Sequence, residues 1–368
     1  MRVHAAIAEA ARAPLSIEAV ELAGLGPHDV LIEARAAGLC HSDLHVLQGG
    51  APSYLFPTIL GHEGAGVVLE CGARVERLKP GDHVVTCAIG ECGHCDNCRS
   101  DRTNLCETKG LPGLAVGMQL SPYFSRGGRP IATQTGGAAF ATHTIIDQDF
   151  VTKVPSALPW DVACLFGCAV LTGVGAVLHT AKVRPGDTVA VFGLGGVGLN
   201  AVDAARMVGA EKIIGVDLNR AKGELARDFG LTDFIDAGEP DVVSRIQALT
   251  GGGVTHAFEC TGSMSVAELA LRSTRSDYGQ LMVIGAAPAG RDRLALTLGE
   301  VQSGRSILGG LMGKAKPRTD LAAIIDRFMA GELRTDRLIT HRLRQDQIGE
   351  GFRLMEAGES IRSVVLYS

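Results

Sequence analysis

The sequence predicts an α/β fold with two domains, one rich in β-strands and one built around a doubly wound parallel sheet. Three observations support this prediction. The chain has 368 residues, enough for two domains with separate cores. Short apolar runs separated by Gly and Pro turns fill the first 170 residues, and units of a strand followed by a helix come after them.

The strands of the first domain are predicted from its apolar runs. Residues 29–38, 65–75 and 81–90 each place a short apolar run beside a glycine or proline turn. This rhythm is typical of short, mostly antiparallel strands. The chain also has 48 glycines against 11 Phe, 4 Tyr and 1 Trp, which indicates many tight turns and closely packed elements.

The parallel sheet is predicted from repeated strand and helix patterns. Residues 188–210 contain a buried strand, a glycine turn and a helix of small residues, and residues 211–230 repeat strand and helix. Further strands are predicted at 254–260 and 280–285. Mixed helices and short strands return in the last fifty residues, so we expect the chain to leave its first domain, build the sheet and come back.

Composition narrows the choice of partners and compartment. The formal net charge is −5 and no basic cluster is visible, so we expect small-molecule partners and no nucleic acid. No run reaches the ~18 apolar residues of a membrane span, and the N-terminus does not resemble a signal peptide. We therefore expect a cytoplasmic protein without membrane contact. Reduced cysteines suit that compartment, and four are predicted as small buried side chains: Cys71, Cys87, Cys164 and Cys260.

Four cysteines at close intervals predict a metal site. Cys92, Cys95, Cys98 and Cys106 are separated by two, two and seven intervening residues. Four thiolates complete a tetrahedral Zn²⁺ and leave no position for substrate, so the predicted site is structural. An iron–sulfur cluster is the alternative, but its common bacterial pattern has a shorter last interval and a proline where this chain has Glu107. Structural disulfides are a further, less favoured alternative.

A glycine turn predicts a dinucleotide site in the second domain. Residues 193–198, Gly193, Leu194, Gly195, Gly196, Val197 and Gly198, satisfy G-x-G-x-x-G directly between a strand and a helix. Nineteen residues later, Asp217 ends an apolar run, where its carboxylate can accept hydrogen bonds from the adenosine ribose. The same carboxylate would repel a 2′-phosphate. NAD is therefore preferred to NADP, although Arg220 and Lys222 lie nearby and leave some use of NADP open.

Three further motifs give the chain a family resemblance. Cys40 lies in Gly-Leu-Cys-His-Ser-Asp, His62 and Glu63 in Leu-Gly-His-Glu-Gly-Ala-Gly, and Cys168 in Leu-Phe-Gly-Cys-Ala-Val. With the glycine turn, Asp217 and the closing Ser-Ile-Arg-Ser, these motifs resemble the zinc-dependent alcohol dehydrogenases of the medium-chain dehydrogenase/reductase superfamily. The resemblance covers nearly the whole chain. It is nearest to the long forms, the liver-type and glutathione-dependent formaldehyde dehydrogenases.

The resemblance implies a catalytic zinc as the second metal of the chain. Cys40, His62 and Cys168 would bind it and leave a fourth position open for water or substrate. Glu63 would sit behind the metal, and Asp43 would orient the imidazole of His62. Zinc would then lower the pKa of a bound alcohol, and the resulting alkoxide would release hydride to the nicotinamide ring.

Proton release and cofactor contacts are also implied by the resemblance. Ser42 would accept the alcohol proton, and the cofactor ribose would pass it to His45 near the surface. His41 and Arg362 would contact the cofactor pyrophosphate, and Thr172 would touch the nicotinamide end. Together with Asp217 and Lys222 these residues complete the predicted cofactor site.

The family architecture implies definite domain limits. A GroES-like catalytic domain would cover residues 1–169 and be completed by residues 312–368. A Rossmann NAD-binding domain would cover residues 170–311. Family members dimerise or tetramerise through sheet edges of the coenzyme domain, so a homodimer or homotetramer is expected.

The substrate is predicted from the pocket positions of the family. Ala88 falls where a bulky aromatic residue often narrows the pocket, with Gln134, Thr135 and Leu311 as other candidate wall residues. The leading hypothesis is therefore reversible oxidation of a primary, aromatic or otherwise bulky alcohol to an aldehyde or ketone.

Two other hypotheses remain open. The first is oxidation of the glutathione adduct of formaldehyde. Ala51 and Gly110 argue against it because they replace the acidic residue and the arginine expected for glutathione, and Lys109 is the only nearby cation that could compensate. The other is a non-catalytic dinucleotide-binding protein, which the intact set of ligands argues against.

Overall fold

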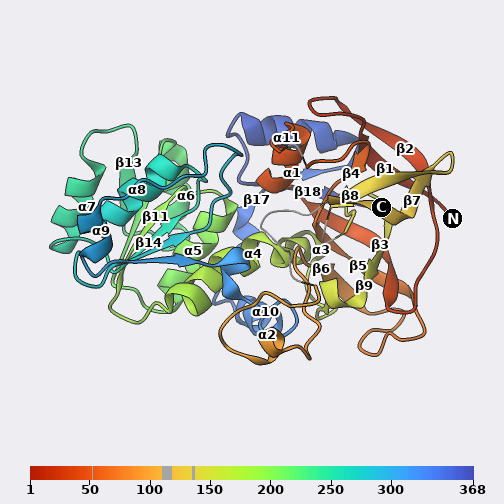
Figure 1. The fold of residues 1–368 in the computed structure, drawn as a ribbon, viewed down its shortest axis with the longest axis horizontal. Helices are drawn as coiled ribbons and strands as arrows, with labels where there is room; N and C mark the ends of the chain where they lie inside the picture. Colours follow the sequence, from red (N-terminus) through yellow and green to blue (C-terminus); the bar gives the residue numbers. More distant parts are fainter. Residues whose placement is uncertain (52, 110–117, 135–136) are drawn as a thin grey trace. The chain divides into compact units, whose positions relative to one another are not determined.

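The computed structural model of the chain describes residues 1–51, 53–109, 118–134 and 137–368. Contacts divide the chain into two units. Unit 1 comprises residues 1–168, 316–329 and 335–368, and unit 2 comprises residues 169–315 and 330–334. The family architecture predicts domain boundaries at 169/170 and 311/312. It assigns residues 330–334 to the catalytic domain, whereas the contacts assign them to unit 2. Figure 1 gives the course of the chain through both units.

Unit 1 contains a closed barrel in its N-terminal part. The barrel order is β1 (Arg2–Ala8), β2 (Leu15–Leu22), β7 (Met118–Arg126), β8 (Arg129–Gln134) and β4 (Thr58–Ile59). β1 and β2 pair antiparallel along seven positions, and β8 pairs parallel with β4. Alternate side chains of these strands fill the barrel, including Val3, Ile7, Phe124 and Ile131.

A second sheet of unit 1 carries the metal-binding segments. Its strands are β10 (Val151–Lys153), β6 (His83–Thr86), β5 (Glu63–Cys71), β3 (Asp29–Gly38), β18 (Arg362–Leu366) and β17 (Ile339–Leu343), with β9 (His143–Asp147) also paired to β3. β18 comes from the end of the chain and pairs antiparallel with β3. The C-terminal segment thus completes the sheet that the N-terminal half begins.

Short helices connect the strands of unit 1. Their bounds are α1 (His41–Leu47), α2 (Asp96–Arg99), α3 (Trp160–Ala163), α10 (Leu321–Met329), α11 (Ile348–Glu356), and the 3₁₀ turns η1 (Gln148–Phe150), η2 (Cys164–Gly167), η5 (Thr335–Leu338) and η6 (Gln345–Gln347). α11 is amphipathic and buries Ile348, Phe352 and Met355 in a cluster with Leu39 and Leu44. This cluster fixes α1, which begins directly after Cys40.

Unit 2 is a parallel sheet of six strands with helical connections. The order is β13 (Asp233–Asp236), β12 (Lys212–Asp217), β11 (Thr188–Phe192), β14 (His256–Glu259), β15 (Gln280–Val283) and β16 (Ser306–Gly309), and every neighbouring pair is parallel. The strand order reverses between β11 and β14, and ligands of such sheets bind beyond the carboxyl ends of the strands at this point. This is the doubly wound sheet predicted from the sequence.

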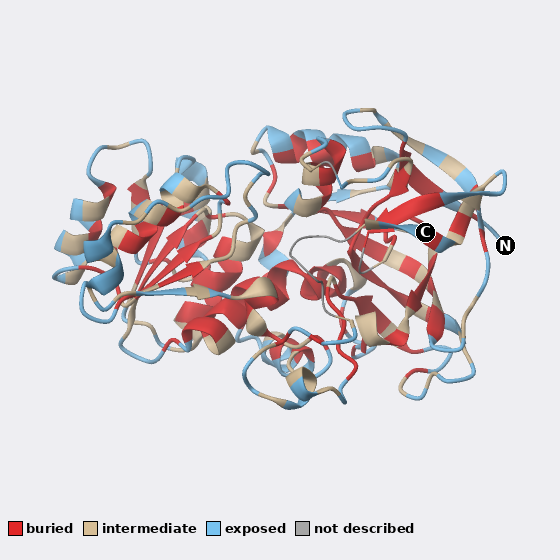
Figure 2. Cartoon of the chain, viewed as in Figure 1, coloured by how far each residue is buried: buried red, intermediate tan, exposed pale blue. Residues whose placement is uncertain are grey.

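Helices alternate with the strands of unit 2. They are α4 (Ala169–Gly175), the π-helical η3 (Ala176–Ala181), α5 (Gly196–Met207), α6 (Arg220–Arg227), α7 (Val242–Thr250), α8 (Met264–Arg272), α9 (Leu298–Gln302) and the turn η4 (Leu311–Lys314). Figure 2 shows the strands of the sheet as buried and the outer faces of the helices as exposed. Strands covered by helices in this way are continuously apolar, as Val189, Ala190 and Val191 of β11 are.

Within the described ranges, no single helix is long and apolar enough to cross a bilayer. Only the bent pair Trp160–Gly167 and Ala169–Ala181 has that length and composition when the two helices are taken together.

Candidate functional site

Four predicted residues come together in unit 1 from three separate segments. Cys40 precedes α1, His62 and Glu63 stand at the start of β5, and Cys168 follows η2. One donor atom from each of the four lies within 4.8 Å of the others. Two thiolates and an imidazole suit Zn²⁺, so the donor set fits the metal that the family resemblance implied.

Glu63 and Arg362 form a buried ion pair behind this cluster. Arg362 on β18 donates to Glu63 Oε2, and both side chains are almost fully buried. Gly38 of β3 lies between them, and a Cβ there would stand 2.2 Å from Glu63 Oε2. Glu63 Oε1 has no hydrogen-bond partner among the described residues. A buried carboxylate oxygen left free beside three metal ligands is consistent with occasional coordination by Glu63.

Asp43 determines which nitrogen of His62 can face a metal. Asp43 Oδ1 lies 3.1 Å from His62 Nδ1. Its two oxygens also accept the backbone N–H groups of Gly61 and Cys40. Nδ1 therefore carries the proton that points to Asp43, and Nε2 is left to bind the metal. The structure thus gives Asp43 the geometry of the orienting carboxylate expected from the family.

The electrostatics of the cluster favour a thiolate at Cys40. The hydrogen bond from Cys168 lowers the pKa of Cys40 well below its usual value, with His62 acting in the same direction against burial. That hydrogen bond, together with burial, raises the pKa of Cys168. Burial alone would lower the pKa of His62, but the negative charges of Asp43 and Cys40 outweigh it and raise this pKa. A divalent cation would balance the negative charge that these groups share.

The two predicted relay residues lie on α1. Ser42 Oγ is 3.7 Å from Cys40 Sγ, so its hydroxyl stands beside a metal ligand. His45 is one helical turn further on, and both side chains are half-buried. Their roles in proton release stay predictions, because the path between them includes the cofactor ribose.

The four closely spaced cysteines form the second cluster of unit 1. Their sulfurs lie within 4.8 Å of one another, with Cys92 Sγ 3.9 Å from Cys98 Sγ and Cys95 Sγ 4.0 Å from Cys106 Sγ. Zn–S bonds of about 2.3 Å at tetrahedral angles place sulfurs about 3.8 Å apart, whereas a disulfide needs about 2.05 Å. The geometry fits a zinc site and does not fit disulfides.

Against the effect of burial, hydrogen bonds lower the pKa of two of these thiols, Cys95 and Cys106, and so favour their metal-binding thiolate form. Cys95 caps α2 by accepting from Cys98 N. Burial would raise the pKa of Cys106, but hydrogen bonds from the Thr108 hydroxyl and nearby backbone N–H groups lower it to about 6. A thiolate at neutral pH is the form that binds metal.

Residues far away in the sequence anchor this cysteine lobe. Lys316 donates to the backbone oxygens of Cys98 and Ser100, and Arg318 donates to that of Cys92. Buried Glu91 accepts from the backbone of Arg318 and from Thr319. The sequence pattern does not indicate these contacts, because more than 200 residues separate the partners. The acidic residue next to Cys92 was the only local signal of them.

The glycine turn of unit 2 has the form required for a pyrophosphate. Gly193 has φ +92°, a left-handed conformation that side chains disfavour. A Cβ on Gly198 would stand 1.9 Å from Gly193 O, whereas one on Gly195 would meet nothing within 4 Å. The turn therefore packs tightly against β11 and leaves open space at Gly195, before the N-terminus of α5. Gly196 and Val197 begin that helix, so these residues fit NAD.

Asp217 is the last residue of β12 and lies beside the glycine turn. Its Oδ2 accepts from Leu194 N at 2.8 Å and its Oδ1 accepts from Asn219 N, so the carboxylate is tied to the glycine turn. Lys222 Nζ lies 4.0 Å from Asp217 Oδ2. Arg220 pairs instead with Asp236 and Glu239. Arg220, one of the two cations that could bind a 2′-phosphate, is thus engaged by other carboxylates.

The three other residues predicted to contact NAD are Thr172, His41 and Arg362. Thr172 on α4 is buried and donates to Met312 Sδ at 3.5 Å. His41 is exposed at the first position of α1. The predicted cofactor roles of Thr172, His41 and Arg362 stay predictions, and the structure adds the pair with Glu63 to what the sequence indicated for Arg362.

The predicted pocket residues lie in both units. Half-buried Ala88 donates its N–H to Gly167 O, next to Cys168, at 3.5 Å. Half-buried Leu311 belongs to unit 2. Gln134 is buried with Oε1 3.3 Å from His62 Nδ1, a contact that the sequence did not suggest. Gly110 and Thr135 lie outside the described residues.

Known proteins are similar to this chain over its whole length. Residues 26–156 match the alcohol dehydrogenase GroES-like domain and residues 196–329 match the zinc-binding dehydrogenase domain. The chain is 43% identical to S-(hydroxymethyl)glutathione dehydrogenase of Paracoccus denitrificans and 42% identical to alcohol dehydrogenase class-3 of Cereibacter sphaeroides, covering 100% of both chains in each case. Its structure is similar to that of benzyl alcohol dehydrogenase from Acinetobacter calcoaceticus, with a TM-score of 0.89, 28% identity and 100% coverage of each.

Proposed function

We propose, since the chain belongs to the zinc-binding alcohol dehydrogenase family, that it oxidises the hydroxymethyl adduct of formaldehyde with a thiol, in the first place S-(hydroxymethyl)glutathione. The chain is an NAD-dependent zinc alcohol dehydrogenase. The observation that supports the thiol adduct is the identity of 42–43% over full length to relatives of that name or class. This identity favours the glutathione adduct of formaldehyde, the alternative substrate in the sequence-based hypotheses, over the bulky alcohol.

The residues of the site would have separate roles in the reaction. Cys40, His62 and Cys168 would hold zinc, which as a Lewis acid lowers the pKa of the substrate hydroxyl while NAD accepts the hydride. Asp43 keeps the imidazole in the tautomer that leaves Nε2 free. Ser42, beside Cys40, would take up the hydroxyl proton.

The thiol adduct is tested by the requirement for a thiol. We expect NADH formation from formaldehyde only when glutathione is present, and no comparable rate with formaldehyde alone. A thiol without carboxylates, such as 2-mercaptoethanol, serves as the matched control, because its adduct has the same reacting carbon without the peptide. An equal rate with both thiols would show that the enzyme does not recognise the peptide portion.

A second candidate substrate is a bulky or aromatic alcohol. It is supported by small Ala88 beside the Gly167–Cys168 segment and by the similarity to benzyl alcohol dehydrogenase. The ion pairs of Lys109 also favour the alcohol over the glutathione adduct. Lys109 was the cation proposed to compensate for the missing arginine, yet its Nζ lies 2.5 Å from Asp147 Oδ2 and 3.9 Å from Asp149 Oδ2. Rapid NADH formation from benzyl alcohol, with none from formaldehyde and glutathione, would establish this function instead.

We further propose a homo-oligomer in the cytoplasm. Support for association comes from β16, the last strand of its sheet, whose side chain Ile307 is 42% exposed. The neighbouring helix α9 exposes Leu298 and Val301. The unpaired backbone groups of an apolar edge strand can form hydrogen bonds with a strand of a second copy. Support for the cytoplasm comes from the ten cysteines, since all are free of disulfides.

A further inference from the structure

Gln134 contacts the catalytic ligand His62 from a strand of the barrel. It is the last residue of β8 and is 2% exposed. Gln134 Oε1 lies 3.3 Å from His62 Nδ1, and Asp43 Oδ1 lies 3.1 Å from the same nitrogen. One N–H group thus faces two acceptors, one charged and one neutral.

The two acceptors differ in what else they bind. Asp43 also accepts from the backbone of Gly61 and Cys40, so its negative charge is spread over three donors. Gln134 Oε1 brings no net charge. A second acceptor on another strand resists rotation of the imidazole ring away from Asp43, and ring orientation decides where the metal-binding nitrogen points.

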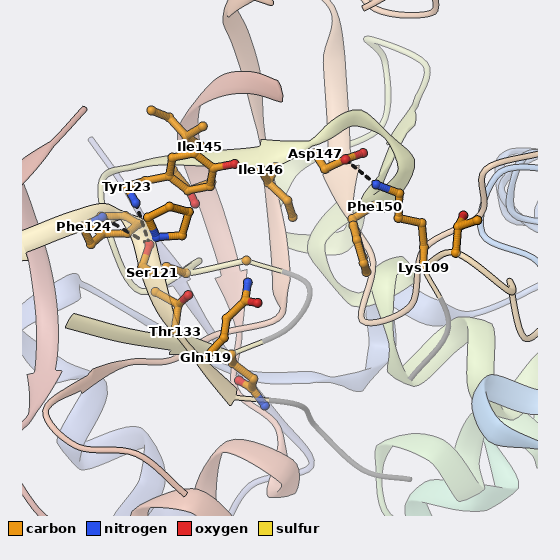
Figure 3. A pocket seen from close by; sticks show the side chains of 16 residues that line it. Lys109, Gln119, Ser121, Tyr123, Phe124, Thr133, Ile145, Ile146, Asp147 and Phe150 are labelled. Atoms are coloured by element: carbon orange, nitrogen blue, oxygen red, sulfur yellow. Dashed lines mark hydrogen bonds and ion pairs between the residues drawn. The ribbon is translucent and has the colours of Figure 1, made fainter. Parts of the chain in front are cut away.

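Gln134 also lines a cavity in unit 1. The cavity has a volume of about 330 Å³, and Gln134 lines it together with Ser121, Thr133 and Thr144. Figure 3 shows Gln119, Ser121, Tyr123 and Thr133 around this space. Gln134 Nε2 has no partner within the described part of the chain, and neither has Thr144 Oγ1.

Both atoms, Gln134 Nε2 and Thr144 Oγ1, are buried away from solvent, so the cavity does not decide the orientation of the amide. The imidazole decides it: with Oε1 toward His62, the N–H group of Nδ1 meets a second acceptor. The reversed amide would place two donors against each other and leave the buried N–H of His62 with Asp43 as its only acceptor, which is less favourable.

We propose, on the basis of the catalytic zinc site assigned above, that Gln134 is a second positioning residue for His62. It shares the Nδ1 proton with Asp43 and thereby slows the loss of zinc, whichever substrate the enzyme uses. Neither the sequence pattern nor the expected orienting role of Asp43 includes this contact.

The experiment compares Gln134→Met with Gln119→Met. Methionine keeps the length of glutamine but removes the acceptor. Gln119 is the matched control because it is exposed on β7, lines the same cavity and pairs with Thr133, the neighbour of Gln134. For each protein loaded with two zinc ions per chain, the rate of zinc release to a chromophoric chelator is measured. The visible spectrum of cobalt substituted at the catalytic site is recorded as well.

We expect Gln134→Met to release the catalytic zinc about 10- to 100-fold faster, because loss of an orienting partner typically lowers metal affinity by that factor. Its cobalt spectrum should shift, whereas Gln119→Met should behave as the wild type. Unchanged release and an unchanged spectrum in Gln134→Met would overturn the proposal. Both readouts are independent of substrate, so a failure of the thiol-adduct hypothesis would not affect them.

Gln134→Glu provides a second test should the methionine variant fail to fold. Its carboxyl group retains an oxygen that can accept from His62 Nδ1 whether or not it is protonated. We therefore expect its zinc release to stay within about threefold of the wild type, less than the change expected for loss of the partner. Release more than tenfold faster in Gln134→Glu would contradict a role as acceptor.

Discussion

At the scale of single residues, the ligands and the residues touching them carry the function. Cys40→Ser removes one thiolate of the catalytic set and leaves the other cluster intact. We expect NADH formation to fall at least about 10³-fold, because the zinc that activates the hydroxyl is no longer held. Zinc measured by atomic spectroscopy should fall from two to about one ion per chain, while far-ultraviolet circular dichroism stays unchanged. Full activity in this variant would exclude the proposed metal site.

Asp217 is expected to decide between NAD and NADP. Asp217→Asn keeps one acceptor for the glycine turn but removes the charge that repels a 2′-phosphate. We expect kcat/KM for NAD to fall about 10-fold, corresponding to ~1.4 kcal/mol for a weakened hydrogen bond, and the NADP/NAD ratio to rise at least as much.

The matched control for Asp217 is Asp236, on the neighbouring strand β13. Asp236 pairs with Asp217 in the parallel register of β12 and β13, and it holds Arg220. Asp236→Asn should leave the NADP/NAD ratio within about twofold, because Asp217 keeps its charge and Arg220 keeps its second partner, Glu239. An equal change in both variants would mean that the general negative charge of this edge selects the cofactor, and not the carboxylate of Asp217.

At the scale of elements, the cysteine lobe depends on the segment that returns from unit 2. Lys316→Met removes the ammonium that donates to Cys98 O and Ser100 O. Hydrogen bonds from charged donors contribute roughly 1–3 kcal/mol, so we expect the unfolding temperature to fall by about 3–10 °C. Zinc content should stay near two ions per chain, since no sulfur is lost. A normal unfolding temperature, measured by calorimetry, would show that the lobe is held by its metal alone.

At the scale of the whole molecule, association is expected through the edge of the parallel sheet. Ile307→Lys places a charge on exposed β16, where it would be buried by a second copy. We expect light scattering after size exclusion to give a monomer where the wild type gives a dimer or tetramer. Leu120→Lys, at another exposed apolar position on β7, is the control and should not change the mass. An unchanged mass in Ile307→Lys would place the interface elsewhere.

Local spacing made much of the fold and site predictable. The interval between cysteines, the glycine turn and an acid at a strand end are set by chain geometry over a few residues. Cys92, Gly195 and Asp217 could therefore be assigned to their sites from the sequence. The parallel sheet was predictable as well, because buried strands followed by helices give a characteristic apolar pattern.

Some of the site followed only from family resemblance. Cys40, His62 and Cys168 stand in three segments with no common spacing, and each alone would be read as an ordinary buried side chain. The family motifs brought them together in advance, and the structure places their donor atoms within 4.8 Å of one another. The same resemblance suggested two substrates, and the full-length relatives favour the thiol adduct over the bulky alcohol.

The sequence by itself determined the fold class, the four-cysteine cluster by its spacing and the predicted preference for NAD, while the second metal cluster needed the family motifs as well. Tertiary structure alone decided that Arg362 pairs with Glu63, that Lys316 holds the cysteine lobe and that Gln134 contacts His62. The physical reason is that these contacts join residues 72 to 299 positions apart. No local periodicity encodes them. The contacts of Arg362 and Gln134 arise only when β18 pairs with β3 and the barrel closes at β8, and that of Lys316 arises only when residues 316–329 return to unit 1.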